Sequence, residues 1–118
     1  MNTGIQELTE TTFDQAVATG VTAVDFWAAW CGPCRAMAPQ LERAAELRPG
    51  HRFAKVDVDA EPALAARYGI RSIPTIMVLR DGQPIAAQAG LITADRLVAA
   101  LDRIAADGTD ATEARRAA

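Results

Sequence analysis

Two cysteines, Cys31 and Cys34, stand in a Cys-x-x-Cys arrangement with Gly32 and Pro33 between them, and the chain has no other cysteine. This spacing suits either redox chemistry, in which two thiols close reversibly into a disulfide, or metal binding. A closed zinc site normally takes four ligands, and the chain offers these two cysteines and one histidine. The ligand count therefore favours redox chemistry and leaves zinc as an alternative that would need a second chain.

The elements on either side must position this pair. Residues 22–28 are almost wholly apolar, which is typical of a strand buried on both faces of a sheet. Pro33 suits the first turn of a helix that we expect to run to about Leu47. Cys31 then lies at the helix start, where unpaired backbone N–H groups and the helix dipole favour a thiolate. Cys34 lies one turn later, close enough to resolve a mixed disulfide, so we expect Cys31 to be the more exposed and the more reactive thiol.

The rest of the chain alternates strand and helix patterns. Further strands are expected at 4–8, 52–58, 75–80 and 83–89, and further helices at 12–20, 61–68 and from Thr93 onward. Thr12 to Gln15 matches a capping box, and Asp81-Gly82 is a two-residue hairpin signal. The order βαβαβαββα requires parallel strands with crossover helices and a closing hairpin. We therefore predict an α/β fold with a central mixed five-stranded sheet and helices on both faces.

Length and composition indicate one globular domain. We predict that it covers residues 1–106 and that residues 107–118, which are polar or Ala-rich, form a disordered tail. The formal net charge of −3 offers no electrostatic basis for binding nucleic acid or anionic membranes. No apolar run is long enough to span a membrane, and the N-terminus has no signal-peptide pattern. We therefore expect a cytoplasmic protein, where a purely structural disulfide would be unusual.

One carboxylate stands out because of its place in the apolar strand. Asp25 lies in the middle of residues 22–28, where an unpaired charge would be costly. From the residues alone, a structural and hydrogen-bonded Asp is the favoured interpretation, since buried carboxylates are often structural. A role in proton transfer is the alternative.

The chain resembles the thioredoxin family from about Ile5 to Ile104. The matching segments keep the family's order and spacing: Val24-Asp25-Phe26-Trp27, Trp30-Cys31-Gly32-Pro33-Cys34, Lys55-Val56-Asp57-Val58-Asp59, Tyr68-Gly69-Ile70-Arg71, Ile73-Pro74-Thr75, Asp81-Gly82 and Gly90. The resemblance implies the thioredoxin fold and a protein disulfide reductase that acts by dithiol–disulfide exchange. It reverses the preference at Asp25 in favour of proton transfer.

The resemblance also implies a role for each site residue. Cys31 is expected to be the attacking thiolate and Cys34 the resolving thiol, with Asp25 moving its proton and Lys55 as the partner of Asp25. The expected active-site loop contains Trp30, Gly32 and Pro33. The expected substrate-binding surface contains Trp27, Ile73, Pro74 and Gly90, with Pro74 in the cis form and Trp30 on an exposed rim.

The partners that the resemblance implies are other proteins. Thioredoxin reductase is expected to restore the dithiol with NADPH, and no bound cofactor or metal is expected. The implied substrates are disulfide proteins such as ribonucleotide reductase, peroxiredoxins and methionine sulfoxide reductase, within electron transport and cell redox homeostasis. We expect a monomer. An oxidant or isomerase is disfavoured because Gly32 and Pro33 replace the histidine usual in such relatives, whereas an added scaffold or holdase role stays open.

Overall fold

The computed structural model describes residues 4–117, with side chains as far as Asp107. The first three residues of the predicted domain, and most side chains of the predicted tail, lie outside the described residues. The strands are β1 (Ile5–Glu7), β2 (Val21–Trp27), β3 (Arg52–Asp57), β4 (Thr75–Arg80) and β5 (Gln83–Ala89). The helices are α1 (Phe13–Ala16), α2 (Gly32–Leu47), α3 (Pro62–Arg67) and α4 (Ala94–Ala117).

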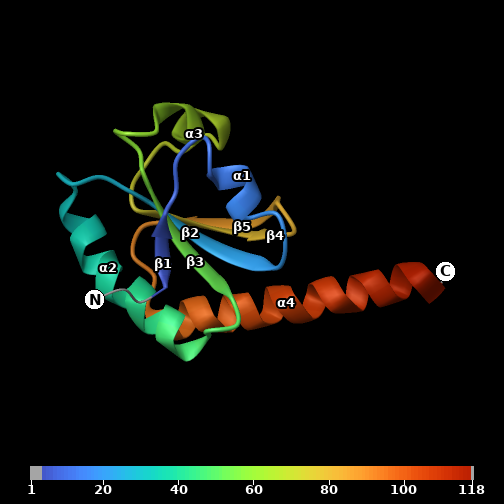
Figure 1. Ribbon diagram of the computed structural model, residues 1–118. Helices are drawn as coiled ribbons and strands as arrows, with labels where there is room; N and C mark the ends of the chain where they lie inside the picture. Colours follow the sequence, from blue (N-terminus) through green and yellow to red (C-terminus); the bar gives the residue numbers. More distant parts are fainter. Residues whose placement is uncertain (1–3, 118) are drawn as a thin grey trace.

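The strands form one five-stranded sheet in the order β1-β3-β2-β4-β5. β1, β3 and β2 run parallel (Figure 1). On the other side of β2, β4 pairs antiparallel with β2, and β5 pairs antiparallel with β4. Asp81 and Gly82 join β4 to β5 with φ angles of 52° and 83°, the left-handed conformation that a two-residue hairpin turn requires. The predicted mixed sheet and its element order are confirmed.

Alternate residues of the central strand enter two separate cores. Val21 and Ala23 pack with residues of α2 and α4, whereas Val24 and Phe26 pack with residues of α1 and α3. Six of the seven β2 residues are buried, as expected of a strand covered on both faces. Helices therefore cover both faces of the sheet. The carboxyl end of β2 leads directly into the Cys-x-x-Cys segment.

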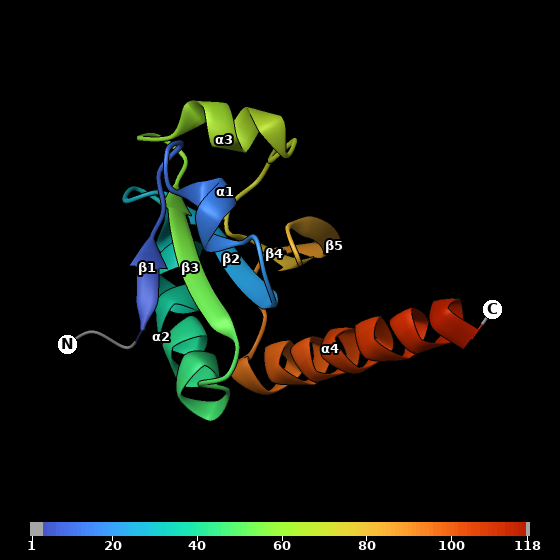
Figure 2. The ribbon, with the colours of Figure 1, turned by 45° about the vertical axis from the view of Figure 1, so that its right-hand side comes forward.

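One local feature differs from the sequence expectation. Thr12 makes no side-chain capping bond to α1, so the predicted capping box is wrong. Its Oγ1 instead accepts a hydrogen bond from the Thr9 N–H at 2.9 Å, because a threonine can satisfy a preceding turn as readily as a helix start. At the other end of the chain, α4 continues past Asp107 to Ala117 and projects beyond the sheet (Figure 2). The domain boundary at residue 106 and the disorder of the tail stay predictions.

Candidate active site

The two cysteines lie where β2 meets α2, and they form a disulfide with their Cα atoms 5.2 Å apart. Cys31 is the N-cap of α2, and its Sγ accepts a hydrogen bond of 3.1 Å from the Cys34 backbone N–H. Pro33 occupies the first turn, as predicted. A sulfur therefore takes the place of the usual capping oxygen, so charge that develops on Cys31 faces a backbone donor and the positive end of the helix.

The expected difference in exposure between the cysteines is wrong for the oxidised protein. Both residues are 4% exposed. The disulfide holds the two sulfurs together, and Trp27, Val58 and Ile73 pack against both cysteines. Neither cysteine is therefore more exposed to solvent than the other. What distinguishes Cys31 is its contact with the N-terminus of α2.

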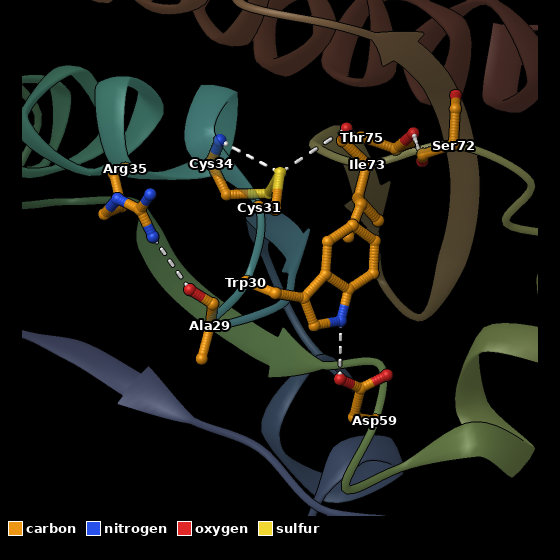
Figure 3. Close-up of a disulfide and its surroundings, with 9 residues drawn as sticks. All are labelled: Ala29, Trp30, Cys31, Cys34, Arg35, Asp59, Ser72, Ile73 and Thr75. Atoms are coloured by element: carbon orange, nitrogen blue, oxygen red, sulfur yellow. Dashed lines mark hydrogen bonds between the residues drawn. A yellow bond between two sulfur atoms is a disulfide. The ribbon is translucent and has the colours of Figure 1, made fainter.

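A second loop lies against the sulfur of Cys31. The Ile73 carbonyl oxygen is 3.7 Å from Cys31 Sγ (Figure 3). The Ile73-Pro74 peptide bond is cis, which confirms that expectation. The Gly90 N–H donates to the Pro74 carbonyl at 2.8 Å, which ties the end of β5 to this loop. Gly90 has φ of 90°, and nothing lies within 4 Å of the position a Cβ would take there. Ile73, Pro74 and Gly90 thus lie together beside the disulfide, with open space over the glycine.

Trp30 forms one wall of an apolar groove next to the cysteines. It is 68% exposed, as expected, and its Nε1–H donates to Asp59 Oδ2 at 2.8 Å (Figure 3). The groove has a volume of about 160 Å³ and is lined by Trp30, Val58, Ala65, Ile70, Arg71, Ser72 and Ile73. It could hold an apolar side chain of an extended partner within reach of the disulfide.

Asp25 is fully buried, and among the described residues neither of its carboxylate oxygens has a hydrogen-bond partner. It shares its face of β2 with Val21 and Ala23, which pack against Met37 and Leu41 of α2. Its carboxyl group therefore points to the side of the sheet that α2 covers. Burial raises the pKa of Asp25 to about 6, against the opposing pull of the Lys55 ammonium group. The hydrogen bonds that a structural Asp needs are absent among the described residues.

Lys55 and Trp27 lie next to Asp25 on the same side of the sheet. Lys55 is the direct partner of Asp25 in the β2–β3 register, and its Nζ lies 4.4 Å from the centroid of the Trp27 ring. Trp27, Cys34 and Lys55 all line one cleft behind the disulfide, together with Ala28, Ala29, Arg35 and Ala38. Cys34 and Lys55, the strand partner of Asp25, therefore line the same cleft.

The fold brings all the predicted site residues to one end of the sheet, on both sides of the disulfide. Sequence reasoning assigned no role to Val58, Asp59, Ser72 or Glu7, which contact the predicted residues. Val58 and Asp59 could have been found, because they directly follow β3 at the sheet edge where such sites lie. Glu7, whose Oε2 accepts from Trp27 Nε1–H at 3.0 Å, carried no signal, since an edge strand of three residues shows no pattern.

Two further observations concern the described residues. They contain no group of three or more His, Cys, Asp or Glu side chains placed to hold a metal ion. Within residues 4–117, no helix combines the length and the apolar character that crossing a bilayer requires.

Comparison with known proteins gives a consistent result. Residues 4–103 match the Thioredoxin family model. Thioredoxins of Staphylococcus aureus strains MW2 and COL are each 44% identical to this chain over 100 residues, covering 84% of this chain and 96% of the relative. Among solved structures, a mutant thioredoxin from Halobacterium salinarum is similar with a TM-score of 0.79 and 33% identity, covering 86% of this chain and 89% of that one.

Proposed function

This chain belongs to the thioredoxin family, and from that premise we propose that thioredoxin reductase recycles it with NADPH and that it reduces disulfides in several cellular proteins. Its Cys31–Cys34 pair carries out dithiol–disulfide exchange. The observation that carries the proposal is the sulfur of Cys31 at the N-cap of α2, beside an apolar groove and the Ile73 carbonyl. Ribonucleotide reductase, peroxiredoxins and methionine sulfoxide reductase are the proposed substrates, and a cytoplasmic monomer is the proposed form.

The proposed reaction has two steps. In the first, the Cys31 thiolate attacks one sulfur of the substrate disulfide, a mixed disulfide forms, and the other substrate sulfur leaves as a thiolate that takes up a proton from water. In the second, Cys34 loses its proton to the Asp25 carboxylate and attacks Cys31 Sγ. The Cys31–Cys34 disulfide forms, and the second substrate sulfur leaves as a thiolate that also takes up a proton from water. The substrate therefore gains two electrons and two protons in total.

Asp25 suits the second step because its pKa of about 6 leaves it mainly ionised at pH 7 while it remains a stronger base than an exposed carboxylate. Trp30, Val58 and Ile73 are proposed to receive an apolar side chain of the substrate, with Gly90 leaving room for its backbone. Lys55 is proposed to partner the Asp25 carboxylate electrostatically, and the cleft that Lys55 lines with Cys34 is proposed as the route by which the proton reaches solvent.

The test is insulin reduction with two separate sources of electrons. With dithiothreitol, the wild type should accelerate precipitation of the insulin B chain, and Cys31→Ser should lose this effect down to the rate without protein. With NADPH and thioredoxin reductase, only the wild type should consume NADPH in proportion to insulin. Retained acceleration by Cys31→Ser would contradict the reductase function and favour a scaffold or holdase. Activity with dithiothreitol alone would contradict recycling by the reductase.

The substrates can be captured with Cys34→Ser, which carries out the first step and cannot complete the second. Disulfide-linked partners that elute with dithiothreitol should include the three proposed enzymes, and Cys31→Ser is the matched control that should retain none. Absence of all three from the eluate would contradict the proposed substrate set.

A further inference from the structure

Glu7, on the edge strand β1, is linked to the proposed proton-transfer residues through Trp27. Its Oε2 accepts the hydrogen bond of the Trp27 indole at 3.0 Å, and the same indole ring carries the Lys55 ammonium group 4.4 Å from its centroid. Glu7 is also the direct partner of Lys55 in the β1–β3 register. One exposed carboxylate therefore accepts a hydrogen bond from the ring on which Lys55 lies and is paired with Lys55 across the two strands.

Glu7, Lys55 and Asp25 form a row across three neighbouring strands. Directly paired residues of adjacent strands point to the same face, so Lys55 lies between a carboxylate from β1 and a carboxylate from β2. On the other side of Asp25, β4 places the apolar Ile76. From α2, Arg35 reaches the same cleft as Lys55, but its guanidinium donates to the Ala29 carbonyl. The charges that act on Asp25 are those of Lys55 and Glu7.

We infer that Glu7 is a positioning residue of the redox site, which shares the Lys55 ammonium group with Asp25 and thereby strengthens Asp25 as a proton acceptor. Lys55 can neutralise either carboxylate, because the strand register places it between them. The Asp25 anion is then less stabilised and binds a proton more readily. Burial and the charge of Glu7 both raise the pKa of Asp25, whereas Lys55 lowers it.

The expected size follows from the spacing of the strands. Side chains two strands apart are separated by roughly 10 Å. At that distance, with an effective dielectric of about 40–80 for a partly exposed pair, removing one unit charge shifts a pKa by roughly 0.3–0.6 units. Because Glu7 is exposed, salt should reduce the shift, so the measurement belongs at low ionic strength.

The test is a ¹³C NMR titration of the Asp25 carboxyl carbon in the oxidised full-length protein. Glu7→Gln removes the charge and keeps an oxygen that can accept from Trp27. We expect the Asp25 midpoint to fall by roughly 0.3–0.6 units in this variant. Glu10→Gln, which removes the same charge three residues along, should leave the midpoint within about 0.1 units of the wild type. An unchanged or raised midpoint in Glu7→Gln, or an equal fall in both variants, would overturn the inference.

The inference uses Asp25 in the role proposed above, and a second measurement separates the two. The acid limb of the pH profile of insulin reduction should move with the NMR midpoint in Glu7→Gln and should be absent in Asp25→Asn. If the NMR midpoint moves and the activity profile does not, the electrostatic effect of Glu7 stands and the proton-transfer role of Asp25 fails. Unchanged tryptophan fluorescence in Glu7→Gln would support an effect of charge, whereas a fluorescence change without an NMR shift would show a merely structural role.

Discussion

Asp25 is buried in β2 with both oxygens unpaired among the described residues, and its pKa is raised to about 6 because of that burial. A raised carboxyl pKa means that the folded protein holds the proton more tightly than the unfolded chain. The cost to stability is therefore absent below about pH 4, develops as the pH rises to about 6, and is complete above that. The ionised carboxyl group therefore weakens the fold at neutral pH, which is compatible with the proposed role of Asp25 as a base.

We expect Asp25→Asn to be more stable than the wild type at pH 7. A shift of about two units corresponds to about 3 kcal/mol, and the unpaired amide offsets part of this, so a gain of about 1–3 kcal/mol is expected. The gain should shrink toward zero near pH 3, where the wild-type carboxyl group is mainly neutral in both states. Urea denaturation of both proteins at the two pH values measures this. A large loss of stability at pH 7 would identify Asp25 as a structural residue.

Cys31 should react before Cys34 in the reduced protein, although the two are equally exposed in the disulfide form. The Cys34 N–H and the α2 N-terminus stabilise a thiolate at Cys31, whereas Cys34 lies inside the first turn. With limiting iodoacetamide, peptide mapping should show Cys31 labelled at least several-fold over Cys34. The urea-unfolded protein is the control and should label both alike. Preferential labelling of Cys34 in the folded protein would reverse the assignment of the two thiols.

The start of α2 is the element that combines these residues into a site. The central strand β2 ends just before this helix, at the carboxyl-terminal end of the sheet. Cys31 caps the helix, and Pro33 occupies a position in the first turn where its missing N–H has no hydrogen-bond partner to lose. Gly32 and Pro33 are exposed and bring no ionisable group to the sulfurs. The charge that the dithiol experiences from this segment is thus limited to the helix terminus and the backbone donor.

We expect Pro33→His to make the protein a stronger oxidant. An imidazolium near Cys31 would stabilise the thiolate and hence the reduced form. If the thiol is shifted by one to two pKa units, the reduction potential rises by roughly 30–60 mV for this two-electron couple. Equilibration with glutathione buffers at pH 7 gives the potentials of the wild type, Pro33→His and the neutral control Pro33→Gln. A potential no higher than that of the control would mean that the charge between the cysteines does not determine the reducing character.

At the scale of the whole molecule, two cores on opposite faces of one sheet hold both sides of the site in place. The α2–α4 core fixes the helix that carries the cysteines, and the α1–α3 core fixes the loop before β4, through Ile70 and Ile73 packed against it. Arg48 and Asp102 join α2 to α4 with two hydrogen bonds of 2.8 Å. Ile104 is the last residue of α4 that is buried among the described side chains. The core therefore closes before the helix ends.

We expect a chain that ends after Asp107 to fold and work like the full-length protein. Every described core residue is retained, and so is the hydrogen bond of 3.1 Å from Arg80 Nη1 to the Ile104 carbonyl. The free energy of unfolding in urea should change by less than about 0.5 kcal/mol, and insulin reduction should keep its rate. Ending the chain after Leu97 is the destabilising control, since it removes Leu101 and Ile104 from the core. A clear loss of stability in the first truncation would place the domain boundary beyond residue 106.

The sequence by itself determined the order of the elements and the place of the cysteines. The apolar run at residues 22–28, the turn at Asp81-Gly82, and Pro33 after Cys31 are local signals, and each acts through its own backbone preferences or burial. These signals placed β4 and β5 without error and the start of α2 within one residue. The local signal at Thr12 failed because a neighbouring turn competed for the same hydroxyl.

Only the tertiary structure decided which distant residues meet. The contact of Ile73 with Cys31, the groove under Trp30, and the row of Glu7, Lys55 and Asp25 each depend on strand order and register. Register is a property of paired strands, so no pattern within β1 could show that Glu7 lies beside Lys55. Likewise, the pKa of Asp25 depends on the helix and strands that exclude water from it, which is why its chemistry emerges only in the folded chain.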